Sequence, residues 1–381
     1  MTNKQAHDGA NAEPKNVLQL CHSYSMPFHD VARQYTALFK ETGYRVVTVF
    51  LTGKTCAEIE AVCASDEVIF LEYTSKDLCG LKRRQIKAIR GLHNKYLFDF
   101  AIAHRYKSLY IASHVPDLFV MGVQHAFGGY GRFMRRWYVT RKQDRIALIG
   151  ISNAIRDDMR QHLPKVAPER IQTLYNRIDV EALEQRLVDR ETARKALGLP
   201  PEGYVFGNVG RLHPDKDQAT LLRAFARSSD HMPDSMVAIV GKGHLEQSLK
   251  DLADELGVRD RVHFTGVVPD AARYFKAFDA FVLTSDHEPF GMVLLEAMVA
   301  GLPMAVCDSG GAPEVVQGLA KMFDLRDDAT LSRHMVTLYK MSADTVSNEK
   351  KKLIEKVESD FSDVSVKTLF WNICDSMGLR E

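Results

Sequence analysis

The feature that most constrains this chain is an alternation of short buried strands with helical segments, which runs twice along its 381 residues. Apolar, β-branched runs such as YRVVTVFL recur, with helix-like spacing between them. Strands separated by helices predict a parallel sheet with both faces covered. In the first half, the expected strands are Asn16–Leu20, Tyr44–Leu51, Val68–Leu71, Phe98–Ala103, Leu118–Val123 and Ile146–Ile151.

A second alternating series follows a linker that contains Gly198, Pro200, Pro201 and Gly203. A charged segment with helical spacing, roughly 180–197, precedes this linker. The expected strands of the second series are Val205–Val209, Met236–Val240, Val262–Phe264, Ala280–Leu283 and Met304–Val306. Because a chain of this length exceeds one ordinary hydrophobic core, we expect two domains of the α/β class.

The two series set the expected domain boundaries. Residues 1–15 are polar and predict a disordered lead-in, 16–180 form the first domain and 181–360 the second. The tail, 361–381, carries apolar residues at helical spacing, so we expect a helix that packs back across the first domain.

Composition and charge narrow the function. No apolar run reaches the length of about 18 residues that indicates a membrane span. The six cysteines are scattered without a C-x-x-C pair, which argues against a disulfide framework or a zinc site and fits a reducing cytoplasm. Residues 1–180 carry a net charge of +9 and the remainder −8, which indicates either an anionic partner for the first half or two surfaces that merely balance.

Two carboxylates eight residues apart form the strongest motif, Glu288-Pro-Phe-Gly-Met-Val-Leu-Leu-Glu296. Pro289 and Gly291 break the chain, so we expect a helix that begins near Met292 and carries Glu296 on its second turn. The free amides at such a helix start form an anion site. Carboxylates about 10 Å apart on either side can accept hydroxyl hydrogen bonds at both ends of one ligand. The alternative is a surface helix with two solvated glutamates.

Glycines and basic residues follow the neighbouring strands. Gly210-Arg211-Leu-His-Pro-Asp-Lys216 comes directly after a strand, and its two cations suit a diphosphate. Gly241-Lys-Gly243 ends the next strand, and Gly310-Gly311 forms a third small-residue turn. None of these segments completes a dinucleotide or P-loop fingerprint. The alternative for each is an ordinary solvated loop.

Taken in order, these motifs resemble the retaining glycosyltransferase family 4, whose members have the GT-B fold. The resemblance covers roughly residues 16–380, is strong from 204 to 318, and is loose in the first half. It implies two Rossmann-like, doubly wound domains that face a cleft. The similar segments are Gly210-Arg211-Leu-x-x-x-Lys216, Val240-Gly241-x-Gly243, Phe264-Thr-Gly266-Val, Glu288-Pro-Phe-Gly291 through Glu296 to Pro303, and Gly310-Gly311-x-x-Glu314.

The resemblance also implies residue roles. Arg211 and Lys216 would hold the donor diphosphate, Glu288 would bind the sugar hydroxyls, and Glu296 would bind the ribose. The remaining donor-binding positions, most of them acting through backbone groups, would be Gly210, Gly241, Gly243, Gly266, Phe290, Gly291 and Met292. His125, at a strand end of the first half, would approach the donor sugar, or it makes only a local hydrogen bond. His104 is expected to be structural.

The implied reaction transfers a hexose from a nucleotide-diphosphate sugar, with UDP favoured, to a glycan or glycolipid, and retains the anomeric configuration. No nucleophilic triad or metal-ligand arrangement stands out, so we expect no cofactor and no divalent metal. Two alternatives stay open: a nucleotide-sugar epimerase of the same fold and a non-catalytic nucleotide-sugar-binding protein.

One segment departs from the family resemblance. The family's glycine-rich loop after the first strand is replaced here by residues 22–30. In this segment His22, His29 and Asp30 either bind an acceptor or, as we favour, form a polar turn.

A basic run occupies residues 132–145, with six positive charges, one negative charge and three aromatic residues, and 82–107 is also basic. Such a run can lie against an anionic membrane, bind a phosphorylated acceptor, or form a solvated helix face, and we favour the first two together. Nucleic acid is not an expected partner, because the net charge of the chain is only +1. By resemblance, we expect a cytoplasmic protein, peripheral on the inner face of the membrane, in cell-surface polysaccharide or lipopolysaccharide-core biosynthesis.

Overall fold

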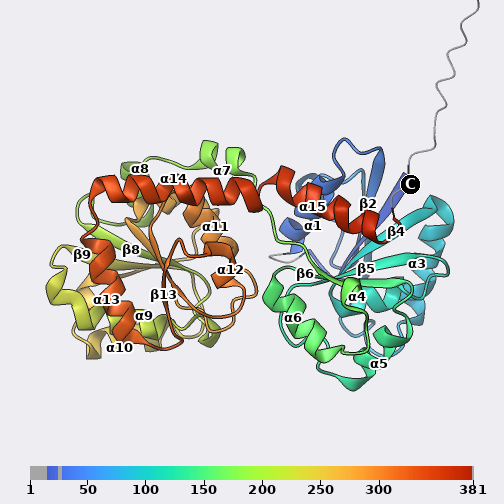
Figure 1. Ribbon diagram of the computed structural model, residues 1–381, viewed down its shortest axis with the longest axis horizontal. Helices are drawn as coiled ribbons and strands as arrows, with labels where there is room; N and C mark the ends of the chain where they lie inside the picture. Colours follow the sequence, from blue (N-terminus) through green and yellow to red (C-terminus); the bar gives the residue numbers. More distant parts are fainter. Residues whose placement is uncertain (1–14, 25–27, 380–381) are drawn as a thin grey trace, which may run out of the picture.

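The structure is a computed structural model that describes residues 15–24 and 28–379. Most of the expected lead-in, 1–14, and residues 380–381 lie outside this part, whereas Lys15 is the first residue of a strand. Figure 1 shows two α/β domains side by side, with the C-terminal helices (red) running across both. The expected fold class of two Rossmann-like parallel-sheet domains is therefore confirmed.

The first domain is built on a parallel sheet with seven strands among the described residues, in the order β3-β2-β1-β4-β5-β6-β7. The strands are β1 (Lys15–Cys21), β2 (Tyr44–Thr52), β3 (Glu67–Tyr73), β4 (Phe98–His104), β5 (Phe119–Gln124), β6 (Ile146–Gly150) and β7 (Ile171–Thr173). The sheet grows in both directions from β1, which makes it doubly wound. Consecutive residues such as Val17 and Leu18 are fully buried, so both faces are covered.

The helices of the first domain follow its strands along the chain. They are α1 (Phe28–Thr36), η1 (Ala37–Phe39), α2 (Ala57–Cys63), α3 (Arg83–Tyr96), α4 (Arg105–Ala112), α5 (Phe133–Arg141), α6 (Asn153–His162) and η2 (Pro168–Arg170). Asp30 therefore lies in the first turn of α1, and the predicted polar turn is wrong at this residue. The side chain of His29 lies outside the described part.

The second domain repeats this plan with six described strands in the order β10-β9-β8-β11-β12-β13. The strands are β8 (Tyr204–Val209), β9 (Ser235–Val240), β10 (Val262–Gly266), β11 (Ala280–Leu283), β12 (Met304–Cys307) and β13 (Lys321–Phe323). The helices between and after them are η3 (Pro214–Lys216), α9 (Gln218–Ser228), η4 (Ser229–His231), α10 (Glu246–Glu255), η5 (Arg259–Arg261), η6 (Ala271–Ala277), α11 (Met292–Val299), α12 (Ala312–Val316) and α13 (Asp328–Tyr339).

The charged segment 180–197 forms two helices where the sequence predicts one. α7 (Val180–Arg186) and α8 (Arg190–Leu197) are separated by three residues. The amide of Val188 donates to the carbonyl of Arg273, 3.1 Å away, and the side chain of Asp189 accepts from the amide of Thr192 at 2.9 Å. A tertiary contact and a new N-cap thus break a segment whose spacing alone is continuous.

The C-terminal part of the chain forms two helices that tie the domains together. α14 (Ala343–Asp360) lies over the second domain and α15 (Asp363–Ser376) over the first (Figure 1). The Nε1 atom of Trp371 donates to the carbonyl of Leu38 at 3.0 Å, and its ring lies 5.4 Å from that of Phe39. At the crossing point, the amide of Ile178 donates to the carbonyl of Phe361 at 2.9 Å. α15 is therefore packed on the first domain.

Candidate functional site

Two site residues predicted separately meet at the carboxyl edge of the second sheet. Lys216 ends η3 after β8, and Glu288 lies in the loop after β11. The Nζ atom of Lys216 donates to Oε2 of Glu288 at 2.6 Å, and only 19% and 10% of the two side chains are exposed. β8 pairs with β11, so the two loops emerge side by side. The pair is therefore largely buried, and both charges are held in place.

Arg211 lies apart from this ion pair. Its side chain is 71% exposed, and its Nη2 atom lies 3.3 Å from a carboxylate oxygen of Asp215. The structure therefore places the second predicted cation on the same loop as Lys216, at the surface, without a contact to Glu288.

The glycines at this edge bring neighbouring loops together. A Cβ atom on Gly241 would lie 2.0 Å from the carbonyl oxygen of Gly210, and one on Gly243 would lie 2.1 Å from that of Leu212. The amide of Gly241 also donates to the carbonyl of Gly266 at 2.8 Å. Gly241 and Gly243 thus permit close contact between backbone segments, where the sequence predicts close approach to a ligand.

The helix after Glu288 begins as predicted. Gly291 has a φ of 98° and is the N-cap of α11, whose first residue is Met292. The Phe290 side chain is buried, with its ring 5.9 Å from Tyr175 and 5.7 Å from Phe361, so only its backbone is available to a ligand. The amide of Gly311 donates to the carbonyl of Glu288 at 2.7 Å, which fixes the backbone beneath this carboxylate.

Glu296, on the second turn of α11, lines a different part of the molecule. It faces a cavity of about 470 Å³ between the domains, which Met292 also lines. Burial, followed by the nearby carboxylates of Asp30 and Asp270, raises the pKa of Glu296 to about 7, and Arg186 opposes this shift. Glu288, Lys216 and Arg211 do not line this cavity. The structure therefore separates the two glutamates of the motif into distinct environments.

Two histidines meet at the carboxyl edge of the first sheet. His104 ends β4 and His125 follows β5, the adjacent strand, and their Nδ1 and Nε2 atoms lie 3.0 Å apart. Burial, followed by the charge of Arg105, lowers the pKa of His125 to about 3. Burial, followed by His125, also lowers the pKa of His104 well below its ordinary value, so both imidazoles are neutral near pH 7. Their pairing was not predicted, although both follow neighbouring strand ends in the sequence.

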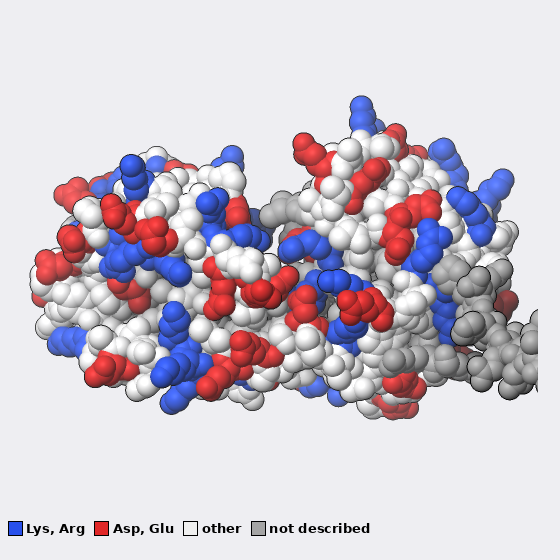
Figure 2. Space-filling model, turned by 90° about the horizontal axis from the view of Figure 1, so that it is seen from above, with Lys and Arg blue, Asp and Glu red and all other residues white. Residues whose placement is uncertain are grey.

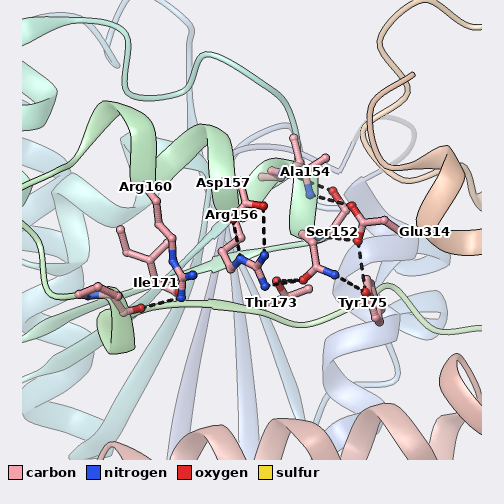
Figure 3. A network of polar contacts seen from close by, with 12 residues as sticks. Ser152, Ala154, Arg156, Asp157, Arg160, Ile171, Thr173, Tyr175 and Glu314 are labelled. Carbon is pink, nitrogen blue, oxygen red and sulfur yellow. Dashed lines mark hydrogen bonds and ion pairs between the residues drawn. The ribbon is translucent and has the colours of Figure 1, made fainter. Parts of the chain in front are cut away.

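A network between the domains joins three segments that the sequence does not connect (Figure 3). The carboxylate of Glu314, on α12, accepts from the backbone amides of Asn153 and Ala154 at 2.7 Å each, and from the hydroxyl of Tyr175 at 3.2 Å. Ser152 caps the same helix, α6, by accepting a 3.1 Å hydrogen bond from the amide of Ile155. Glu314 of the second domain thus completes the N-terminus of a first-domain helix.

The expectation of a metal-free site overlooks a D-x-D spacing at Asp215-Lys216-Asp217. Asp215 pairs with Arg211 and with Nδ1 of His213, the latter at 2.5 Å, and Asp217 accepts from the hydroxyl of Thr220 at 2.6 Å. Both carboxylates therefore have local partners. Over 15–24 and 28–379, no group of three or more His, Cys, Asp or Glu side chains is arranged to hold a metal ion.

The basic run 132–145 contains α5, which exposes three large apolar side chains. Phe133 is 66%, Met134 65% and Trp137 48% exposed. No helix in the described part of the chain is both long and apolar enough to cross a membrane.

Comparison with known proteins finds sequence similarity over most of the second domain. Residues 189–357 match the family model described as Glycosyl transferases group 1. A D-inositol 3-phosphate glycosyltransferase from Mycobacterium marinum is 36% identical over 157 residues, which are 39% of this chain and 32% of that protein. The lipopolysaccharide core biosynthesis glycosyltransferase LpsD from Rhizobium meliloti is 37% identical over 142 residues, 37% of this chain and 40% of that protein. The matched part of the chain thus spans between about a third and two fifths of the length of these curated relatives.

Solved structures extend the likeness to the whole fold. A glycosyltransferase from Rickettsia africae superposes with a TM-score of 0.84 at 13% identity, covering 97% of this chain and all of that one. Alr3699/HepE from Anabaena, in complex with UDP-glucose, has a TM-score of 0.75 at 18% identity and covers 95% of this chain and 99% of that one. The chain therefore has the GT-B fold, and its second domain carries the sequence pattern of the group 1 glycosyltransferases.

Proposed function

We propose that this protein is a retaining glycosyltransferase that transfers a hexose from a nucleotide-diphosphate sugar, with UDP favoured, to a glycan or glycolipid. The observation that carries the proposal is the Lys216–Glu288 ion pair, 2.6 Å long and largely buried at the start of α11. Charges fixed in a partly dry site stabilise developing charge more strongly than solvated ones, because they need no reorganisation during the reaction.

In this proposal each group has a different task. Lys216, joined by Arg211 from the same loop, neutralises the departing diphosphate, and Glu288 accepts hydrogen bonds from the sugar hydroxyls. Near pH 7 His125 is a neutral imidazole, so it acts as a hydrogen-bond partner of the sugar rather than as an acid. The phosphate of the donor takes the proton of the acceptor hydroxyl, and the step uses no metal ion or other cofactor.

UDP is the favoured nucleotide because Alr3699/HepE, with the same fold, is described in complex with UDP-glucose. The likeness to LpsD supports a role in lipopolysaccharide-core or other cell-surface glycan synthesis. The exposed apolar and basic residues of α5 support peripheral contact with the inner face of the cytoplasmic membrane.

A thermal-shift panel of UDP-, GDP- and ADP-sugars tests the donor assignment. A ligand that binds only the folded state raises the melting temperature by mass action, so one nucleotide series should raise it clearly. The same sugars are then incubated without acceptor, because an epimerase would convert the donor alone whereas a transferase needs the acceptor. If no nucleotide sugar raises the melting temperature, the proposal fails.

A further inference from the structure

Four cations lie around the carboxyl edge of the first sheet and come from three separate segments. Lys82 precedes α3, Arg105 and Lys107 lie on the first turn of α4, and Arg135 lies on α5. The structure thus brings together the two basic stretches, 82–107 and 132–145, that are separate in the sequence.

Aromatic rings of α4 connect these segments. The Arg135 guanidinium lies 4.7 Å from the ring centre of Tyr106, and Nζ of Lys82 lies 5.2 Å from that of Tyr110. The two tyrosine rings are themselves 6.2 Å apart. The charges of Lys82 and Arg135 are therefore both held against neighbouring rings of α4.

Three of these cations lack an acidic partner. Within the described part of the chain, Lys82, Lys107 and Arg135 form no ion pair with a carboxylate. Lys82 donates to the carbonyl of Gly80 and Arg135 to that of Gly129, each at 2.8 Å, and these neutral acceptors leave the charges uncompensated. Burial, followed by Lys107, lowers the pKa of Lys82, and Arg135 acts in the same direction.

The same charges act on the histidines of this edge. Burial, followed by Lys107 and then Arg105, lowers the pKa of His22, and Arg105 also lowers that of His125. The Nδ1 atom of His22 is buried without a hydrogen-bond partner among the described residues. The cations therefore border the edge at which the proposed acceptor would meet the donor sugar.

The backbone supports a functional reading of the cluster. Lys82 and Arg105 have φ values of 53° and 68°, in the left-handed region that residues with a Cβ atom disfavour. Such backbone conformations concentrate at ligand-binding and active sites, where the surrounding structure maintains them.

We propose that this cluster binds a phosphate group on the acceptor, held by Lys82, Lys107 and Arg135 with Arg105 at its inner end. The inference rests on the proposed glycosyltransferase function and narrows its acceptor to a phosphate-bearing molecule. A phosphate dianion neutralises cations that otherwise repel one another and accepts several charge-assisted hydrogen bonds at once. The phosphate belongs either to a soluble sugar phosphate or to a phospholipid.

Matched pairs of probes test the proposal on the full-length protein. Glucose 6-phosphate is compared with glucose, and phosphatidic acid with diacylglycerol, both lipids being carried in the same neutral detergent micelles, by thermal shift and by titration calorimetry. One phosphate-bearing probe should bind and its phosphate-free partner should not, and the probe that binds identifies the source of the phosphate. Equal behaviour of the members of both pairs would overturn the proposal.

Variants locate the binding. Lys107→Ala should weaken binding about tenfold or more, because a charge-assisted hydrogen bond is lost, whereas Lys107→Arg should retain most of it. Lys82→Ala gives a second test on a different segment, and the exposed Lys87→Ala on α3 is the control. Unchanged binding in both alanine variants would overturn the assignment.

Each titration is run with and without saturating UDP, so that the two proposals fail separately. Phosphate binding without a UDP-induced shift removes the donor assignment but leaves the anion site in place. A UDP shift without phosphate binding removes the anion site alone.

Discussion

The carboxyl edges of the two sheets differ in how their charges are balanced. In the second domain, Lys216 and Glu288 neutralise each other at 2.6 Å, and tightly packed glycines hold the surrounding loops. In the first domain, Lys82, Lys107 and Arg135 have no acidic partner among the described residues, and the adjacent His125 is neutral. At the second-domain edge the buried cation is therefore paired within the protein, whereas at the first-domain edge three cations have no carboxylate partner.

The distribution of charged side chains over the molecular surface does not reveal this difference. Seen from above, acidic and basic side chains are interspersed over both domains (Figure 2). The net charges of +9 and −8 in the two parts of the sequence therefore do not appear as two faces of opposite sign in this view. The contrast lies in local pairing at the sheet edges.

The largest expected effect comes from breaking the ion pair of the second domain. If the proposed roles hold, Glu288→Gln should lower the turnover of sugar transfer by about 10²-fold or more, because it removes a fixed charge from the proposed sugar site and leaves Lys216 without its charged partner. Steady-state transfer from a UDP-sugar measures the loss. Glu246→Gln, which breaks a half-buried pair with Lys250 within α10, is the control. Full turnover in Glu288→Gln would show that the pair is only structural.

The next effect tests how the two domains are joined. Glu314→Ala should lower the free energy of unfolding by about 1–2 kcal/mol, because the N-terminal amides of α6 lose a charged acceptor. Chemical denaturation followed by circular dichroism measures this change. Glu255→Ala, an exposed carboxylate at the end of α10, should change it little. An effect no larger than that of the control would argue that Glu314 does not hold the domains together.

A pH-dependent change in stability is expected at Glu296. Its pKa rises from an ordinary 4.5 to about 7 in the folded state, so the folded protein binds this proton more tightly than the unfolded chain. The associated stability is present below pH 4.5 and is lost as the pH rises through about 7. The melting temperature of Glu296→Gln minus that of the wild type should therefore increase as the pH is raised from 5 to 8. A difference that does not change with pH would place the carboxylate in solvent.

The smallest effect concerns the membrane proposed for the first domain. Arg132→Gln should weaken binding to phosphatidylglycerol vesicles about fivefold, since one basic residue near an anionic surface contributes about 1 kcal/mol. Co-sedimentation measures the change, with phosphatidylcholine vesicles as the neutral reference. Arg333→Gln, an exposed arginine of the second domain, is the matched control. Similar behaviour of the two variants would assign the basic run to solvent.

Local signals predicted much of the fold and less of the site. The start of α11 at Met292 was predictable because Pro289 and Gly291 mark it in sequence. β7 and β13 were not, because three residues are too few to show a periodicity. The break in 180–197 depends on a contact with Arg273, which helical spacing cannot reveal.

The sequence alone determined the two α/β domains and the residue types at each strand end, because burial periodicity and turn residues are local properties. Only the tertiary structure decided which of those residues meet. Lys216 and Glu288 are 72 positions apart and touch because β8 lies beside β11. Glu314 reaches Asn153 over 161 positions, and the four cations gather from three segments, because strand order and domain packing bring together loops that are distant in the chain.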